Sequence, residues 1–322
     1  MTRGPILVTL AIAGALSAAF AAAQGRGGQG GDQQAPAATA IQVEKVRSNL
    51  YVLSGGGGNT AAFVTAHGVV LVDTKLPGWG RPILQSLKEI TDKPVTAIIN
   101  THTHFDHVSG NVEFPATVEI VAHENAARQM REMRQPTGVS NAPQENIFSA
   151  HNGAGLPKRT FKDRLTLGSG ADRVELHYFG RAHTSGDAFV VFPALRVMHA
   201  GDAFPNRGIP IIDANNGGSG IEYADTLSKA GSLQNIDTVI TGHNATTLTM
   251  MDMKMYADFN GEFVEAVRAA KKAGRTIDDV ANTWTVPRRY LEGGYTQPPP
   301  GTSGQGTARL RMNIEIVWNE LK

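Results

Sequence analysis

Three histidines and an aspartate follow closely after a short apolar run at residues 95–99, in the stretch NTHTHFDH. They are His102, His104, Asp106 and His107. Side chains two residues apart point to nearly opposite sides of a helix, but they face the same side of an extended segment. The apolar run predicts a buried strand, so the first two histidines would project together from its end. Imidazole and carboxylate groups bind borderline-soft divalent ions, and the cluster therefore predicts a metal site.

Three further candidate ligands each follow a predicted strand, with glycine nearby in the stretches GRAHTSGD, AGD and TGH. They are His183 after residues 174–179, Asp202 after residues 196–198 and His243 after residues 238–240. A glycine at a strand end allows close approach of the backbone, and loops at such ends often carry function. Taken with the first cluster, these residues indicate one shared site.

Short β-rich runs and helical segments have to position these side chains. We predict strands at residues 50–53, 61–65, 69–72, 95–99, 118–122, 174–179, 188–192, 196–198 and 238–240. We predict helices at residues 81–90, 125–134, 223–233, 253–273, 276–281 and 308–321. Blocks of strands broken by helices and followed by a helical tail indicate an α/β layered domain.

Composition excludes several kinds of function. The 322 residues carry 30 Lys and Arg against 29 Asp and Glu, so net charge gives no reason to expect a nucleic-acid partner. The chain has no cysteine, which excludes disulfides, thiolate metal ligands and a cysteine nucleophile. A small-molecule substrate is the expected partner, and the oligomeric state stays open.

The amino-terminal residues predict export. Arg3 precedes an apolar stretch, and small residues follow at positions 21–23, so residues 1–23 resemble a cleaved signal peptide. The apolar stretch is shorter than the ~20 residues of a spanning helix, so no stable membrane span is expected. We expect a periplasmic or secreted protein, with a Gly/Gln/Ala-rich linker at 24–40 and a single domain with a helical tail at 41–322. Residues 293–307, rich in Gly and Pro, predict an extended loop.

The motifs HTHFDH, GRAHTSGD, AGD and TGH, in this order, resemble those of the metallo-β-lactamase-fold hydrolases. The resemblance covers about residues 43–250 and implies an αββα sandwich with two zinc ions per chain. It implies that one ion is held by His102, His104 and His183, that the other is held by Asp106, His107 and His243, and that Asp202 bridges them. Asp73 matches an acidic position that supports the ligands from behind.

The resemblance also implies the chemistry. A hydroxide shared by two zinc ions is a nucleophile near neutral pH, with Asp106 orienting it as the catalytic carboxylate. The expected reaction is cleavage of a carbonyl–heteroatom bond in a β-lactam, lactone, thioester or ester. The absence of cysteine excludes the lactamase subclasses with a Cys ligand, and Ala203 stands where the remaining subclass has serine. The alternatives are a mono-iron oxidoreductase similar to persulfide dioxygenases and a metal-binding module without activity.

Three other side chains are candidates for substrate contact. Trp79 and Phe105 are possible pocket walls, with simple packing as the alternative for both. His151 lies in a stretch of little periodicity at residues 135–158, and a loop of that length is often functional. The resemblance implies that residues 55–58, all glycine, form a hairpin over the metal site.

Overall fold

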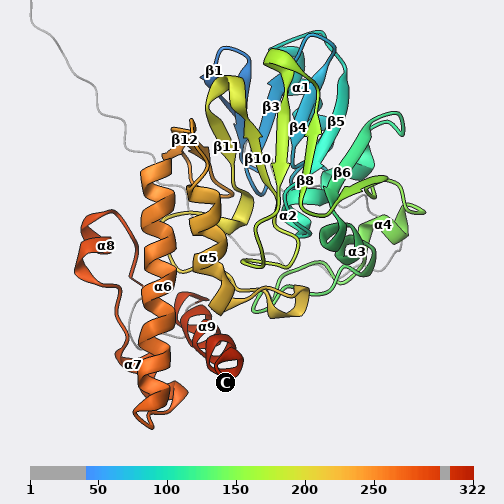
Figure 1. Cartoon of the computed structure of the whole chain (residues 1–322). Coiled ribbons are helices and arrows are strands. Elements are labelled where there is room, and N and C mark those ends of the chain that lie inside the picture. The colour runs from blue at the N-terminus through green and yellow to red at the C-terminus, as the bar shows by residue number, and fades with distance from the viewer. Residues whose placement is uncertain (1–40, 298–304) are drawn as a thin grey trace, which may run out of the picture. The chain divides into compact units, whose positions relative to one another are not determined.

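Two β-sheets packed face to face form the centre of the structure, a computed structural model that describes residues 41–297 and 305–322 (Figure 1). The first sheet has the order β1-β2-β3-β4-β5-β6-β7, and the second has the order β13-β12-β11-β10-β9-β8. The strands of the first sheet are β1 (Gln42–Arg47), β2 (Leu50–Ser54), β3 (Thr60–Val64), β4 (Val69–Val72), β5 (Val95–Asn100), β6 (Glu119–His123) and β7 (Arg159–Phe161). Those of the second are β8 (Arg164–Leu167), β9 (Val174–His177), β10 (Phe189–Phe192), β11 (Val197–His199), β12 (Thr238–Ile240) and β13 (Leu248–Thr249).

Both faces of the central strands are buried, which explains their uninterrupted apolar runs. In β4, Val70 and Val72 pack between the sheets, while Val69 and Leu71 pack on the outer side of the same sheet. Side chains alternate between the two faces of a strand, so a strand covered on both sides must be apolar throughout. The strands β4, β5, β6 and β7 run parallel, so the end of β4, which precedes Asp73, and the end of β5, which precedes the HTHFDH ligands, lie at the same edge of the sheet.

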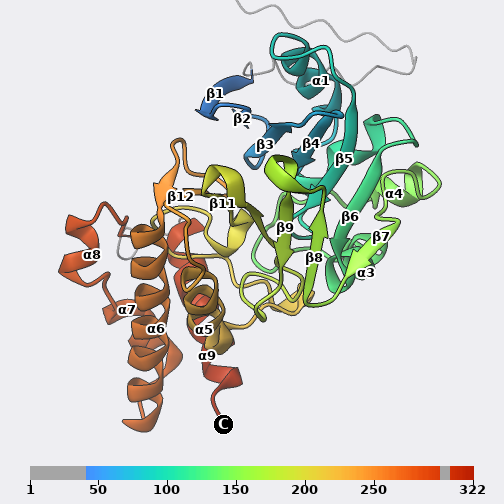
Figure 2. The same ribbon diagram turned by 45° about the horizontal axis from the view of Figure 1, so that its top comes forward.

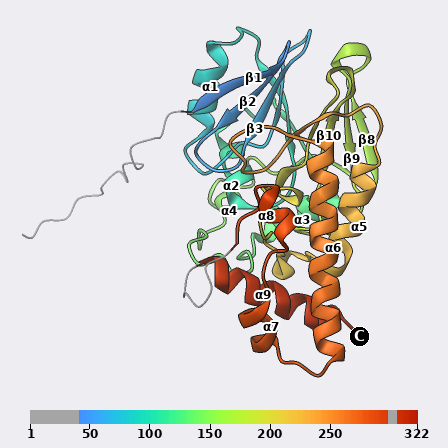
Figure 3. The ribbon, with the colours of Figure 1, turned by 90° about the vertical axis from the view of Figure 1, so that its left-hand side faces the viewer.

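Helices cover the outer faces. They are α1 (Gly80–Lys88), α2 (Phe105–Val108), α3 (Glu124–Glu132), α4 (Ile147–Ala150), α5 (Gly220–Gly231), α6 (Met250–Lys272), α7 (Ile277–Thr283), α8 (Arg288–Glu292) and α9 (Gln305–Glu320). The first of these packs on the first sheet through Ile83 and Leu87 (Figure 2). On the second sheet, α5 and α6 lie side by side, and α9 packs against both and against α7 (Figure 3).

The layers are therefore helix, sheet, sheet, helix, which confirms the predicted αββα sandwich. Each predicted strand and helix is present with its bounds shifted by a few residues. The elements that were not predicted are short or half-exposed and lack a clear apolar pattern, namely the strands β1, β7, β8 and β13 and the helices α2, α4 and α8. The predicted signal peptide and linker, and part of the segment 293–307, lie outside the described residues. No helix in the described ranges has the length and apolar character needed to cross a bilayer.

Candidate metal centre

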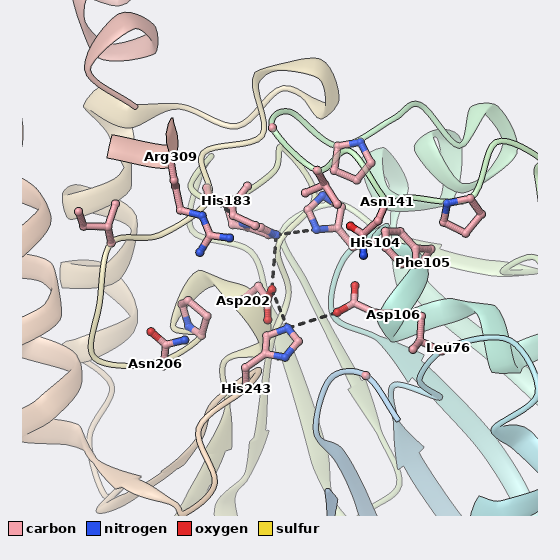
Figure 4. Close-up of a pocket in the computed structure, with 18 residues that line it drawn as sticks. Leu76, His104, Phe105, Asp106, Asn141, His183, Asp202, Asn206, His243 and Arg309 are labelled. Carbon is pink, nitrogen blue, oxygen red and sulfur yellow. Dashed lines mark hydrogen bonds and ion pairs between the residues drawn. The ribbon is translucent and has the colours of Figure 1, made fainter. Parts of the chain in front are cut away.

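The predicted ligands meet at one edge of the two sheets, each just beyond the end of a strand. His102 and His104 follow β5, and the short helix α2 carries Asp106 and His107. From the second sheet, His183 follows β9, Asp202 lies in a single 3₁₀ turn after β11, and His243 follows β12. Both sheets thus contribute to the site, which only their packing against each other can assemble (Figure 4).

One group of potential ligands comprises His102, His104, His183 and Asp202, and one ligand atom from each lies within 4.8 Å of the others. His183 Nε2 is 2.9 Å from His104 Nδ1 and 3.8 Å from Asp202 Oδ2. All four side chains are buried. This is the set predicted for the first ion together with the predicted bridging carboxylate.

A second group comprises Asp106, His107 and His243. His243 Nε2 lies 3.4 Å from Asp106 Oδ2 and 3.3 Å from His107 Nε2. Asp202 faces this group as well, because its Oδ1 is 3.2 Å from His107 Nε2 and its Oδ2 is 3.2 Å from His243 Nε2. The two oxygens of one carboxylate therefore reach both groups, as a bridging ligand requires.

Contacts behind the cluster fix which nitrogen of each ring faces inward. His183 Nδ1 can only donate to the carbonyl oxygen of Ile211, 2.7 Å away, so its Nε2 keeps a lone pair. His104 Nε2 bonds Asp213 Oδ2 at 2.7 Å, which leaves Nδ1 facing the cluster. A ligating histidine commonly has its other nitrogen held in this way by a carboxylate or carbonyl.

Asp73 contacts His107 directly and His102 through Thr101. Its Oδ2 accepts from His107 Nδ1 at 2.8 Å and from the Thr101 hydroxyl at 2.7 Å, and its Oδ1 accepts from the Thr101 amide at 2.8 Å. The Thr101 hydroxyl in turn accepts from His102 Nδ1 at 2.9 Å. Asp73 also forms a third group of potential ligands with His102 and His107. Its oxygens are already used by Thr101 and His107, and its role as a support for the ligands rather than as a ligand stays a prediction.

The residues present fit a metal ion. The Nε2 atom of His102 is buried and has no hydrogen-bond partner among the described residues. The ring centroid of His102 lies 4.3 Å from that of His107 and 4.8 Å from those of His104 and His183. Buried polar atoms are rarely left unpaired, and several imidazoles packed around a carboxylate are the donor set of Zn²⁺ or a similar ion.

Burial and neighbouring charges shift the pKa values of the cluster in different directions. At some positions they favour the neutral histidine or the ionised carboxylate that binds metal, and at others they favour the protonated histidine. Burial, followed by the charge of His104, lowers the pKa of His183 to about 4, and burial also lowers that of His102. Burial alone would raise the pKa of Asp202, but His243 and His107 hold it well below its usual value. Burial would lower the pKa of His107, but the carboxylates around it raise it well above its usual value. An ion at this position must therefore displace a proton.

Two glycines are required by the ligand side chains that lie against them. A Cβ atom on Gly58 would overlap the ring of His107, and one on Gly242 would overlap Asp202 Oδ1. The buried amine of Lys75 holds the glycine turn, because its Nζ donates to the carbonyl oxygens of Leu53 and Gly58, both at 2.7 Å. The predicted glycine hairpin therefore lies against the metal centre.

A pocket of about 540 Å³ opens above the ligands. Its lining consists of Gly57, Leu76, His104, Phe105, Asp106, Pro136, Gly138, Val139, Asn141, Pro143, His183, Asp202, Pro205, Asn206, Ile209, Ile211, His243 and Arg309. Phe105, predicted as a possible wall, is among these residues, and its contact with substrate stays a prediction.

The structure does not bring the other two predicted substrate contacts to this pocket. Trp79 packs against the backbone of Gly56, where it precedes α1, so the packing alternative describes its position. His151 is exposed after α4, and its Nδ1 is 2.9 Å from the carbonyl oxygen of Ile147. The long loop does reach the pocket, but through residues 136–143 rather than through its histidine.

Sequence reasoning missed Asp213 and Arg309. Asp213 is 109 positions from the histidine that it holds and belongs to none of the motifs. Arg309 lies in a helix predicted only as part of the tail, and nothing in its neighbourhood links it to the metal ligands. Neither residue has a spacing signal, because both reach the site only through the packing of distant elements.

Comparisons with known proteins agree with this architecture. Residues 53–251 match the family model described as the metallo-beta-lactamase superfamily. The 2,4-dinitroanisole O-demethylase subunit alpha of Nocardioides sp. (strain JS1661) is 30% identical over 167 residues, which are 50% of this chain and 46% of that protein. The match thus spans about half the length of this curated relative.

Solved structures show the same fold. The metallo-beta-lactamase from Pontibacter korlensis has a TM-score of 0.54 at 17% identity, and it covers 68% of this chain and 98% of its own. DIM-1 metallo-beta-lactamase has a TM-score of 0.53 at 16% identity, covering 69% and 98%. The inverting sec-alkylsulfatase Pisa1 from Pseudomonas sp. has a TM-score of 0.62 at 16% identity, covering 87% and 50%.

The family match spans more than half of the 322 residues and contains each of the motifs that supply the clustered histidines and aspartates. The chain belongs to the metallo-beta-lactamase superfamily.

Proposed function

We propose that this protein is a hydrolase that holds two zinc ions and cleaves a carbonyl–heteroatom bond in a small molecule. The observation that carries the proposal is the buried, unpaired Nε2 of His102 inside a cluster of inward-facing imidazoles. That arrangement leaves a lone pair without a partner in the protein, and a cation satisfies it.

The two groups of side chains divide the ligands between the ions. His102, His104 and His183 would hold one ion, Asp106, His107 and His243 would hold the other, and Asp202 would contact both. Zinc bound there supplies Lewis acidity and lowers the pKa of water from 15.7 to about 7.

Asp106 is the residue that we propose as the catalytic carboxylate. It lines the pocket, and its side chain is 23% exposed, whereas that of Asp202 is only 7% exposed. A carboxylate that reaches both the ligand cluster and the pocket can orient the attacking water and accept its proton. The apolar walls, such as Leu76 and Phe105, would hold the substrate against it.

The substrate class is proposed as a β-lactam, lactone, thioester or ester. A second candidate is cleavage of a methyl aryl ether, which the 30% identity to 2,4-dinitroanisole O-demethylase subunit alpha favours. The pocket volume of about 540 Å³ suits a small molecule in either case.

Metal content and turnover test the proposal together. The full chain is stripped of metal, loaded with zinc and assayed with a chromogenic cephalosporin, a lactone, a thioester, a 4-nitrophenyl ester and 2,4-dinitroanisole. We expect two zinc ions per chain by elemental analysis and hydrolysis of at least one substrate, which a chelator abolishes. Asp106→Asn is expected to lower kcat by about 10²–10⁴-fold.

The alternatives give different results. One bound iron with oxygen consumption would instead favour the mono-iron oxidoreductase. A protein that binds metal but turns over none of the panel would favour the module without activity. If the protein bound no metal at all, the proposed zinc hydrolase function would be wrong.

A further inference from the structure

The helix α9 brings a cation to the pocket from the far end of the chain. Its buried residues Leu310, Ile314 and Val317 pack into the core that also contains α5 and α6. Asn313 Nδ2 donates to the carbonyl oxygen of Pro210 at 2.9 Å, next to the pocket wall. The position of this helix is therefore fixed by packing and by a buried hydrogen bond.

Arg309 projects from α9 into the same pocket as the candidate metal ligands. In Figure 4 its guanidinium points toward Asp202 and His183, which also line the pocket. The side chain is half-buried, and it makes no hydrogen bond or ion pair with any residue in the described part of the chain. Burial lowers the pKa of Arg309, because the guanidinium loses water there.

Neighbouring arginines differ in this respect. Arg311, two positions along the same helix, is exposed and bonds Asp278 at 2.9 Å and Glu315 at 3.2 Å. Arg207, also close to this region, bonds Asp252 at 2.7 Å. Arg309 is thus set apart as a partly desolvated guanidinium that faces a cavity instead of a carboxylate.

The acidic residues of the pocket lining do not neutralise the charge of Arg309 once the proposed metal ions are bound. The acidic residues in its lining are Asp106 and Asp202, and both belong to the proposed ligand set. When they bind divalent ions, their negative charge is offset, and Arg309 remains as a fixed positive charge in the wall. A guanidinium matches a carboxylate in geometry and can bind it through two parallel hydrogen bonds.

We propose that Arg309 binds a carboxylate of the substrate, at a distance from the bond that is cleaved. The substrate class is then a small molecule with a scissile carbonyl group at the metal ions, an apolar body against residues such as Ile209 and Val139, and a carboxylate at α9. Only the placement of the scissile carbonyl at the metal ions rests on the proposed hydrolase function. Binding of the carboxylate is a property of the pocket itself.

Matched substrates test this assignment in the zinc-loaded full chain. Mono-4-nitrophenyl adipate and suberate carry a terminal carboxylate, and 4-nitrophenyl hexanoate and octanoate are their neutral counterparts of equal length. We expect the wild type to prefer the carboxylate member of at least one pair by about tenfold in kcat/KM, mainly through KM, since the contact is made in both ground and transition states.

Three variants test whether Arg309 causes the preference for the carboxylate substrate. Arg309→Gln is expected to remove it, and Arg309→Lys to restore part of it. Arg311→Gln, the control on the same helix, is expected to keep it. The corresponding anilides are measured by titration calorimetry, because an amide analogue that is not turned over reports binding alone.

The outcomes separate this inference from the proposed hydrolase function. Turnover with the same carboxylate preference in Arg309→Gln as in the wild type overturns the inference and leaves the hydrolase standing. Absence of a preference in the wild type at both chain lengths, in turnover and in binding, overturns it as well. Absence of turnover of these esters and of every substrate in the panel above, with carboxylate-dependent anilide binding that Arg309→Gln loses, supports the inference and contradicts the hydrolase.

Discussion

At the scale of single residues, the metal centre depends on which nitrogen each histidine presents. The tautomers are set by acceptors behind the cluster, namely Asp73, Asp213 and the carbonyl oxygen of Ile211. Asp213 also accepts from the backbone amide and the hydroxyl of Thr137, both at 2.9 Å, so its carboxylate is itself held in place. The ligands are therefore oriented before any ion binds, which reduces the entropy lost on binding.

Asp213→Asn tests this orientation. The amide would keep an acceptor oxygen for Thr137 but would remove the negative charge beside His104. We expect metal affinity to fall about 10–100-fold, measured by competition with a chromophoric chelator. Asp237→Asn, an exposed carboxylate that pairs with Arg47 and Arg196, serves as the control and should bind metal as the wild type does. Unchanged affinity in Asp213→Asn would show that the charge is unnecessary.

At the scale of elements, strand ends bring the ligands together and a glycine turn covers them. The turn after β2 lies against His107 because Gly58 lacks a side chain, and Lys75 ties this turn to the end of β2. Lys75 and Asp73 both have a positive φ, 71° and 63°, in the left-handed region that costs a residue other than glycine about 1–2 kcal/mol. This strained backbone lies directly after β4, where the chain turns toward the candidate ligands.

Lys75→Met tests the anchor of the turn. The variant leaves two buried carbonyl oxygens without a donor, and we expect the free energy of unfolding to fall by about 1–3 kcal/mol in urea denaturation at pH 7. Lys93→Met is the control, because Lys93 is exposed and donates to the single carbonyl oxygen of Thr65. Its loss should be clearly smaller, and an equal loss in both variants would contradict the anchoring role.

The same variant should change how stability depends on pH. Burial lowers the pKa of Lys75 from 10.5 to about 7, against the opposing charges of Asp73 and Asp106. Between these values the unfolded chain holds a proton that the folded chain lacks, so this group makes wild-type stability rise as pH increases. Lys75→Met lacks that contribution, and the stability difference between the two proteins should widen from pH 7 to pH 9.

At the scale of the whole molecule, the candidate metal ligands come from both sheets. The first sheet supplies the HTHFDH ligands, and the second supplies His183, Asp202 and His243. An ion bound to both groups is bound by the folded state only, because the unfolded chain does not hold these segments together. Metal binding must therefore stabilise the fold.

Zinc removal tests this coupling. Free zinc at about 1,000 times its dissociation constant is expected to raise the free energy of unfolding by about 4 kcal/mol for each ion bound, seen as a higher melting temperature. The increment should shrink as pH falls. Without metal, carboxylates outweigh burial and raise the pKa values of His104 and His107, so protons compete with zinc at low pH.

The direction in which the stabilisation by zinc changes with pH follows from the linkage between proton binding and folding. In the metal-free protein, a raised histidine pKa contributes stability that is fully present below the unfolded value of 6.5 and is lost as pH rises through the folded value. Zinc binding has the opposite dependence over the same range. The difference in melting temperature between zinc-loaded and metal-free protein should therefore widen from pH 6 to pH 8. A difference that does not change with pH would contradict the proposed competition between protons and zinc.

The layered fold and the candidate ligands could be predicted from the amino-acid sequence. The apolar run at residues 95–99 predicted a buried strand, and HTHFDH with three later motifs predicted which side chains would meet. These signals are local, because strand periodicity and ligand spacing are each contained in a few neighbouring residues. The tertiary structure alone decided that Asp213 holds His104, that Arg309 enters the pocket, and that Trp79 and His151 do not. Such contacts join residues far apart in the chain, and only the packing of loops and of α9 on the two sheets sets which of them form.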